Sequence, residues 1–511
     1  MATAARTRVR VKGTDNYLPT YQAKREAAYD GGSTGRRVRN FMPQSGGINR
    51  LVLGSLQLQR DRARDLARKV PWIESGIDKI VNNVVGTGIK VMPNYTNDNF
   101  KKSASRLYAD WTQECDADGI TDFDGLQALA LRSVVEAGEV FIRIRKRRTT
   151  DGLTVPMQLQ ILEAEYVPID KTETLRNGRH IKAGIEFDRL GRRIAYHMYR
   201  EHPGDILTGM SNLSTVRIPA NEVLHIYDIK RPGQIRGIPW MTPVVTRVRD
   251  LLEYEDAELT RKKTAAMYTA FITKNDEDDY NEGDDEDEEY DDEGVPETQL
   301  EAGTVQILEA GEDVAFSTPA DVGGNYEVFM KMQLRAIAAG IGVTYEQLTG
   351  SLEDVNFSSI RAGLLEFQAR AKRIQRFLIF QLCQPVWKEF VKQAVIFSGL
   401  IAPGFGSNPK KFLKAKWKPP GFRYVNPVQE VNAIKTQIRS GLITRAEAVA
   451  ELGGDIEEID NIQAEDNSRA DGLGLVYDSD PRKTTMSGGS NEKDMSSSDD
   501  DDTKKPNKAG G

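Results

Sequence analysis

One segment constrains the fold more than any other: residues 242–271 combine helical apolar spacing with very high charge. At about 1.5 Å per residue, a helix of this length is roughly 45 Å long. Its apolar positions form only a narrow stripe, made of Val244, Val248, Leu251, Leu252 and Leu259. A helix with so much charge around it cannot be a buried core helix, so we expect it to cross solvent or to pack beside copies of itself. An ordinary amphipathic surface helix is the alternative if the segment is considered alone.

Two more helices follow this segment, and the order of the elements is itself informative. Apolar spacing predicts a second helix over Asn325–Gly340 and a third over Ser358–Phe397, with the loop Val343–Phe357 between them. Pro385 predicts a kink in the third helix. Between the first two helices, residues 274–296 contain almost no apolar side chains and are not expected to pack. The sequence therefore predicts a helix, an acidic insert, a second helix, a loop and a third helix.

The charge of the 511-residue chain is distributed in blocks. The formal net charge is −7, yet the run from Asp276 to Glu293 holds fourteen acidic residues and no basic one, so the remainder carries +7. The first fifty residues hold ten Arg or Lys against three Asp or Glu. Blocks of this kind mark disordered or interaction segments. We expect a flexible basic arm over 1–50 and a disordered Ser-, Asp- and Lys-rich tail over 471–511.

The remaining sequence predicts an α+β body. Helical spacing covers 51–69, 73–85, 100–115 and 125–137. At Glu139 the apolar period changes from 3.6 to 2, and alternating segments follow over 140–145 and 157–161. Asp151-Gly152 between them is a good hairpin turn. We expect one mostly antiparallel sheet over about 140–230, two short strands at 304–308 and 314–316, and two small helices at 427–440 and 444–452.

No catalytic, metal-binding or cofactor-binding residue is predicted. None of the four histidines has zinc-type spacing with another histidine or a cysteine, and His225 on its apolar strand is most simply structural. Cys115 and Cys383 are far apart in sequence, which favours buried thiols in a reducing compartment. Gly86-Thr87-Gly88 follows a helix and lacks the P-loop pattern, so it is a helix stop. No apolar run is long enough for a transmembrane helix.

One basic cluster has two open interpretations. It consists of Arg143, Arg145, Lys146, Arg147 and Arg148 at the end of an alternating segment. The cluster is either a phosphate-binding patch or the solvated end of a strand. The acidic run lacks the spacing of a calcium loop, which favours a solvated, self-repelling insert.

Several sequence blocks, taken together, resemble the phage-lambda-type portal proteins of tailed bacteriophages. In order along the chain, these blocks are Ala63–Arg68 with Pro71-Trp72 and Ile80–Ile89, Arg236–Trp240 with Tyr254–Leu259, Leu334–Leu348 with Phe357–Arg361, and Asn426-Pro427 with Glu430 and Gly441–Thr444. Their order and spacing cover about 50–465, which is most of the chain.

The resemblance implies a ring of identical subunits, usually a dodecamer, at one capsid vertex of the virion. Double-stranded DNA would enter through the central channel during packaging and leave through it at ejection. The implied partners are further copies of this chain, the terminase large subunit, the major capsid protein and head-completion or neck proteins, with assembly in the bacterial host cytoplasm. The implied role is not enzymatic and involves no membrane.

The same resemblance divides the chain into the parts of a portal fold. These are a wing (51–240), a stem helix (241–271), a clip containing the acidic insert (272–322), a returning stem helix (323–342), a channel loop (343–357), a wing helix and strand (358–425) and a crown (426–470).

Two sets of site residues follow from this division. A channel that grips phosphates with cations would stall sliding DNA, and the loop 343–357 contains no Lys or Arg. The residues expected near DNA are Gln347, Ser351, Glu353, Asp354, Asn356 and Phe357. The residues expected at stem subunit contacts are Arg249, Glu253, Asp256, Arg261 and Lys262.

Two other classes of protein stay open at this point. One is another structural head or neck protein. The other is a terminase or nuclease subunit, which would need a Walker motif or clustered catalytic carboxylates, whereas the dense carboxylates here lie in the acidic run.

Overall fold

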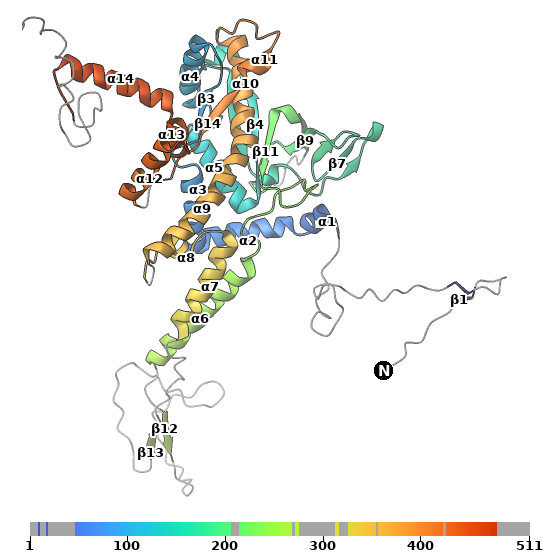
Figure 1. The fold of residues 1–511 in the computed structure, drawn as a ribbon. Helices are drawn as coiled ribbons and strands as arrows, with labels where there is room; N and C mark the ends of the chain where they lie inside the picture. The colour runs from blue at the N-terminus through green and yellow to red at the C-terminus, as the bar shows by residue number, and fades with distance from the viewer. Residues whose placement is uncertain are drawn as a thin grey trace, which may run out of the picture.

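The computed structural model describes residues 46–205, 214–267, 325–353, 356–422 and 426–477, together with four short strands. Two of these strands, β1 (Val9–Arg10) and β2 (Tyr17–Leu18), pair antiparallel near the N-terminus. Figure 1 shows a body of helices and sheets from which one pair of helices projects. The architecture is α+β, as the sequence predicted. None of the described helices combines the length and the apolarity needed to span a membrane.

The N-terminal helices enclose the main hydrophobic core and confirm the predicted helical segments. They are α1 (Ile48–Leu53), α2 (Leu56–Lys69), α3 (Pro71–Val84), α4 (Asp98–Thr112) and α5 (Phe123–Ala137). Asn97 and Asp122 cap α4 and α5 by accepting hydrogen bonds from the backbone of the first turn. At the centre of this core, Trp111 is fully buried and donates a hydrogen bond from Nε1 to the carbonyl of Met157 (2.7 Å).

The β-rich region forms two main sheets rather than the single sheet expected. A three-stranded sheet has the order β11 (Val223–Tyr227), β4 (Glu139–Lys146), β5 (Met157–Leu162). A five-stranded sheet has the order β10 (Thr215–Pro219), β9 (Arg193–Tyr199), β8 (Ile185–Phe187), β7 (His180–Lys182), β6 (Glu173–Thr174). The sheets separate because one face of the first, including Phe141, packs on the second in its own core. The predicted hairpin at Asp151-Gly152 joins β4 and β5.

The projecting pair consists of α6 (Val245–Met267) and α7 (Asn325–Ile341). Both predicted helices are confirmed, but α6 ends before Phe271, which lies instead in β12 (Phe271–Lys274). Phe271, Ile272 and Thr273 favour strand over helix because of their aromatic or β-branched side chains. β12 pairs antiparallel with β13 (Glu312–Ala315), close to the strand predicted at 314–316. The strand predicted at 304–308 and the acidic insert lie outside the described residues.

The third predicted helix is confirmed, but its interruption differs from the expectation. It runs as α9 (Phe357–Leu378), a π-helical turn over Ile379–Cys383 and α10 (Gln384–Phe397). Pro385 lacks an amide hydrogen and its ring clashes with the carbonyl of the preceding turn, so the strain appears as the π turn just upstream. In that turn, the amide of Gln384 donates to the carbonyl of Ile379. The loop predicted between the helices contains a short helix, α8 (Tyr345–Thr349).

The C-terminal elements include one long helix that the sequence did not predict. After α11 (Pro409–Phe412), β14 (Ala415–Lys418) pairs with β3 (Lys90–Pro93) and returns the chain to the body. The helices α12 (Pro427–Arg439) and α13 (Arg445–Glu451) match the two predicted small helices, and α14 (Ile456–Gly472) follows them. Figure 1 shows α14, in red, extending away from the body. No residue of α14 is buried, which explains why its apolar pattern is weak.

Candidate functional site

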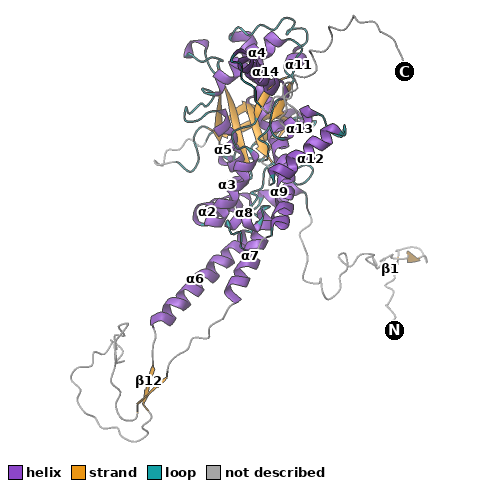
Figure 2. Ribbon diagram, turned by 60° about the vertical axis from the view of Figure 1, so that its left-hand side comes forward, coloured by secondary structure: helices purple, strands orange, loops and turns teal. Residues whose placement is uncertain are grey.

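The projecting helices α6 and α7 lie side by side in both views (Figures 1 and 2). Aromatic rings join them: the ring of Tyr254 lies 5.9 Å from that of Tyr326 and 4.7 Å from that of Phe329, between centroids. Nearer the body, Arg247 donates a hydrogen bond from Nη1 to Oε1 of Gln333 (2.7 Å). The aromatic seam and this polar contact therefore add to the apolar packing nearer the body, where Val248 and Leu251 of α6 and Leu334 of α7 belong to the main core.

The residues predicted for stem contacts form local ion pairs along α6. Arg249 pairs with Glu253 one turn away (2.9 Å), and Arg261 pairs with Glu258 (2.7 Å). The ammonium of Lys262 lies 3.9 Å from Glu258. Asp256 is exposed. Pairs at this spacing stabilise a helix by only about 0.3–0.5 kcal/mol each, so they leave the charged side chains available to other partners.

Among the described side chains, four large apolar ones lie exposed on the projecting pair. They are Val328 (61% exposed), Met332 (59%) and Phe329 (40%) on α7 and Leu259 (52%) on α6. Leu334 of the same helix is buried, whereas Met332 is not. Exposed apolar side chains on a projecting helix pair are candidates for contact with another molecule.

The segment 343–357 is more ordered than the predicted loop. Thr344 and Gln347 form a capping box at the start of α8: the amide of Gln347 donates to Oγ1 of Thr344 (3.2 Å), and Oε1 of Gln347 accepts from the amide of Thr344 (3.1 Å). Leu348 is buried against Gly76 of α3. The side chain of Gln347, predicted to face DNA, is thus used to hold the helix.

The other predicted loop residues divide into three kinds. Ser351 is half-buried and Glu353 is exposed after α8. Asn356 caps α9, since its side chain accepts a hydrogen bond from the amide of Ser359 (2.8 Å). The remaining two predicted residues are only partly covered by the structure. Asp354 lies outside the described residues, and Phe357 begins α9 with its side chain outside the described part.

A buried charge cluster ties the start of the projecting pair to the body, and sequence reasoning missed it. Glu139, at the start of β4, is fully buried between Arg60 of α2 and Arg236. Its Oε1 accepts from Arg60 and from Nε of Arg236 (2.6 Å), while Oε2 accepts from the amide of Gly237 (2.7 Å) and contacts Nε2 of His225 (2.8 Å). The carboxylate thereby joins four segments distant in sequence.

Arg236 uses its remaining donors on backbone carbonyls of the body. Its Nη1 donates to the carbonyls of Val167 (3.1 Å) and Ala183 (2.8 Å), and its Nη2 donates to that of Ala164 (3.1 Å). A guanidinium whose three nitrogens all donate hydrogen bonds fixes the segment that leads into α6. The sequence signal for this cluster is slight: an acidic residue directly before an apolar strand and an arginine in a Gly-rich segment.

The family model described as "Phage portal protein, lambda family" matches residues 34–375. The chain belongs to this family. Residues 34–375 take in α1 to α8 and most of α9, so the match includes the projecting pair, the segment 343–357 and the buried charge cluster.

Curated relatives support the assignment over nearly their whole length. The portal chain is 26% identical over 465 residues to a "Probable portal protein" of Halomonas phage phiHAP-1, covering 89% of this chain and 88% of that protein. It is 21% identical over 475 residues to "Portal protein B" of Escherichia phage lambda, covering 85% and 88%. Among solved structures, a chain in "Neck of empty GTA particle computed with C6 symmetry" is 12% identical with a TM-score of 0.43, covering 82% of this chain and 99% of that chain.

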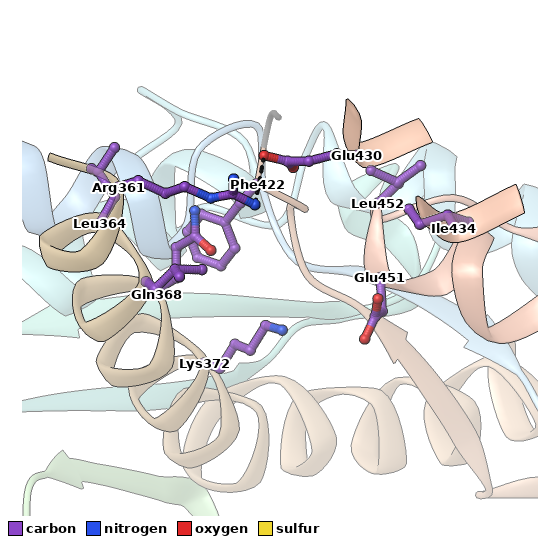
Figure 3. Close-up of a pocket in the computed structure, with 10 residues that line it drawn as sticks. Arg361, Leu364, Gln368, Lys372, Phe422, Glu430, Ile434, Glu451 and Leu452 are labelled. Atoms are coloured by element: carbon purple, nitrogen blue, oxygen red, sulfur yellow. Dashed lines mark ion pairs between the residues drawn. The ribbon is translucent and has the colours of Figure 1, made fainter. Parts of the chain in front are cut away.

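A hollow separates α9 of the portal protein from its C-terminal helices (Figure 3). Figure 3 shows Arg361 and Lys372 of α9 on one side and Glu430 and Glu451 on the other, with the ion pair between Arg361 and Glu430 (3.6 Å) at its rim. A neighbouring hollow of about 700 Å³ continues along α9 beside Pro419 and Pro420. The C-terminal helices therefore meet the body across a hollow with charged side chains at its rim, and their backbone approaches it closely where Leu452 and Gly453 lie against Gly421.

The two cysteines and one possible group of metal ligands among the described residues are held in structural contacts. Burial raises the pKa of both the Cys115 and Cys383 thiols, which keeps them protonated. Glu163, Glu165 and His202 come close enough to hold a cation. Arg64 already pairs with the two carboxylates, donating to both oxygens of Glu165 (2.9 Å each) and lying 3.4 Å from Glu163. A guanidinium at the carboxylates does not fit a metal centre.

The charge cluster predicts a loss of stability on acidification. Burial lowers the pKa of His225 to about 4, although its contact with Glu139 opposes the shift. Its ring stacks between Phe141 and Tyr227, and its buried Nδ1 has no hydrogen-bond partner among the described atoms, as expected for a neutral ring with the proton on Nε2. Although burial alone opposes it, the combined pull of Arg236 and Arg60 holds the pKa of Glu139 well below its usual value.

The sign of this pH dependence is fixed by the direction of the two pKa shifts. Between pH 6.5 and about 4 the unfolded chain protonates His225 more readily than the folded chain, so acidification favours unfolding, by on the order of 3 kcal/mol in total. Glu139 adds a further loss below pH 4.5. Urea unfolding at a series of pH values should show the fall, and His225→Gln should flatten it between pH 6.5 and 4.5. An unchanged slope in His225→Gln would contradict the assignment.

Proposed function

We propose that this portal protein assembles into a closed dodecameric ring at one capsid vertex and that α6 and α7 form its stem. The observation that carries this proposal is the projecting pair itself, with its polar circumference and its exposed Val328, Met332 and Leu259. A closed ring places a neighbouring copy against each side of the pair through one heterologous contact. Arg249, Glu253, Asp256, Arg261 and Lys262 would then exchange part of their local pairing for contacts between subunits.

We also propose that the segment 343–357 lines a channel through which double-stranded DNA passes during packaging and ejection. This segment joins the inner end of α7 to α9 and carries no cation, which suits sliding without a tight grip on phosphates. Ser351, Glu353, Asp354 and Phe357 are the candidates for facing DNA, while Gln347 and Asn356 act first as helix caps. By capping α8 and α9, Gln347 and Asn356 hold the segment 343–357 in place.

The remaining parts follow the same proposal. The segment 272–322 would be the clip that docks the terminase large subunit and later the neck proteins, the helices α12 to α14 would be the crown, and the body would be the wing beside the major capsid protein. The role is structural and not catalytic; the buried, protonated thiols of Cys115 and Cys383 support this. Assembly would take place in the host cytoplasm before incorporation into the virion.

Imaging of the purified protein tests the ring. Negative-stain micrographs should show rings with a central hole, and light scattering should give the mass of a dodecamer. The double variant Val328→Asp with Met332→Asp places two charges in the proposed contact, so it should shift most of the protein to monomers or small oligomers.

The matched control changes an apolar side chain that is at least as exposed but lies away from the pair. Ile401, which is 79% exposed after α10, serves this purpose as Ile401→Asp. Its rings should be indistinguishable from the wild type. Monomeric wild-type protein, or intact rings in the Val328 and Met332 variant, would count against the proposed stem contact.

A further inference from the structure

A row of three arginines runs along one side of β4 and just beyond its end. Arg143, Arg145 and Arg147 alternate with residues of the opposite side, such as the buried Ile144. At the start of β4 the same side is covered, because Phe141 packs into the core shared with the second sheet. Farther along the strand the cover ends: Arg143 and Arg145 are half-buried and Arg147 is exposed. We refer to Arg143, Arg145 and Arg147 as the arginine row.

Neutral amides, and not carboxylates, orient this row. Nε and Nη2 of Arg145 both donate to Oε1 of Gln160 (2.9 and 2.6 Å), and Nε of Arg147 donates to Oε1 of Gln158 (2.8 Å). Gln158 is itself fixed, since its Nε2 donates to the backbone carbonyls of Glu114 and Asp116 (3.0 Å each). An amide oxygen holds a guanidinium in place without cancelling its charge, and it leaves outer N–H groups of both arginines for another acceptor.

The row differs in this respect from the ion-paired arginines of the body. Arg64, Arg132 and Arg217 each lie within 3.5 Å of a carboxylate. Within the described ranges no ion pair joins any arginine of the row to a carboxylate, and the buried Nε of Arg143 has no hydrogen-bond partner there. Burial, followed by the charges of Arg143 and Arg147, lowers the pKa of Arg145. Positive charge is therefore concentrated and oriented at this place, and the nearby carboxylates of Asp118 and Glu222 offset it only in part.

We propose that the arginine row binds the phosphate backbone of double-stranded DNA at a second site, on the body and outside the channel. Side chains on one side of a strand repeat every 6.4–6.8 Å or so, which presents three guanidinium groups in a line to the regularly repeated phosphates of one DNA strand. Arginine suits phosphate because its outer N–H groups donate to two oxygens at once. The exposed Lys146 and Arg148 flank the row and add to the positive field.

Such a contact would be independent of base sequence. The glutamines beside the row are occupied by the arginines and by backbone carbonyls, so they are not available to read base edges. Contacts to phosphate position DNA without specifying its sequence. The choice of DNA over an acidic protein segment rests on the proposed function, which brings DNA to this chain.

Salt-dependent binding tests the row in the full-length protein. Fluorescence anisotropy of a short labelled duplex of mixed sequence, measured over a range of KCl concentrations, gives the slope of log K against log salt. Arg145→Gln with Arg147→Gln removes two proposed phosphate contacts, so the slope should become shallower by about two and the affinity at low salt should fall by at least about tenfold. The basic N-terminal arm contributes equally to every variant and cancels in the comparison.

The matched control removes the same charge elsewhere. Lys410→Gln with Lys411→Gln changes two exposed lysines of α11 and should leave the slope as in the wild type. Equal slopes for the two double variants would overturn the proposal. A peptide of residues 274–296 tests an acidic protein segment as the alternative partner. If this peptide binds through the row and the duplex does not, the row is a protein-docking surface and the proposal fails.

The salt-dependence measurement tests the arginine row whether or not the proposed ring is correct. Both variants are imaged in the same preparation used for binding. Rings of normal appearance with a shallower slope would support the arginine row as a separate DNA contact. Loss of rings in the control and the wild type would instead contradict the proposed function, while the difference in slope would still test the row.

Discussion

Replacing Glu139 with alanine is expected to lower the free energy of unfolding by about 3–5 kcal/mol. The carboxylate is fully buried and compensates both Arg60 and Arg236, which are also buried. Its removal leaves two guanidinium groups in the interior without a counter-charge, and it leaves the amide of Gly237 without its acceptor. Urea unfolding followed by far-UV circular dichroism measures the loss. Hydrogen exchange should also increase in β4, where Glu139 begins the strand.

Glu253→Ala is the matched control for this prediction. Glu253 also pairs with an arginine, at 2.9 Å from Arg249, but both side chains are exposed on α6. Because water screens and solvates this pair, its loss should cost no more than about 0.5 kcal/mol. Similar losses in the two variants would show that the buried cluster does not fix the fold as argued here.

The second large effect is expected at Gly138, between α5 and β4. Its φ of +88° is in the left-handed region, and a Cβ there would lie 2.6 Å from the backbone nitrogen of Pro239. Backbone cannot move aside as a flexible side chain can, so Gly138→Ala should separate the body from the segment that leads into α6. We expect a loss of roughly 3 kcal/mol or more, made of the left-handed strain and the clash. Urea unfolding measures it, and ring formation should fall as well.

Gly152→Ala separates the two parts of this loss. Gly152 has a φ of +78° in the turn between β4 and β5, but a Cβ there would meet nothing within 4 Å. Its substitution carries the left-handed strain alone, at about 1–2 kcal/mol. If Gly138→Ala cost no more than Gly152→Ala, the close approach of the backbone at Pro239 would be unimportant for stability.

Local pattern was sufficient to predict most helices and hairpins. The helices α2 to α5, α7, α9 and α10 have clear apolar spacing, and the turn at Asp151-Gly152 follows from the need for a positive φ. The resemblance to lambda-type portal proteins rested on short blocks, including Arg236–Trp240. The family match confirms it. These features depend on residues that are close in sequence.

Features that depend on distant residues could not be predicted in this way. The charge cluster joins Arg60, Glu139, His225 and Arg236, whose contacts exist only in the folded chain. The division into two sheets likewise depends on which face of β4 is covered. The π turn replaced a simple kink because the strain of Pro385 is relieved one turn earlier.

The candidate site also contains some features that could be predicted from the sequence and others that could not. The high charge around α6 and the absence of Lys and Arg from 343–357 were readable from the sequence. The capping roles of Gln347 and Asn356 were not, although a threonine three residues before a glutamine is a recognisable capping pattern. The arginine row was found as a cluster, but its glutamine partners on β5 emerged only from the register of the sheet.

The pairing of β12 with β13 has a consequence for how this chain can diverge. In the chain, β12 follows α6 and β13 precedes α7, so a hairpin base is already paired before the residues 275–311 are reached. Once a hairpin is closed at its base, doubling the length of what lies beyond it costs only about 0.6 kcal/mol of chain entropy. The tip can therefore gain, lose or exchange residues while the pair below keeps its geometry. Strong acidity at this position is a property that can change without the rest of the molecule having to follow.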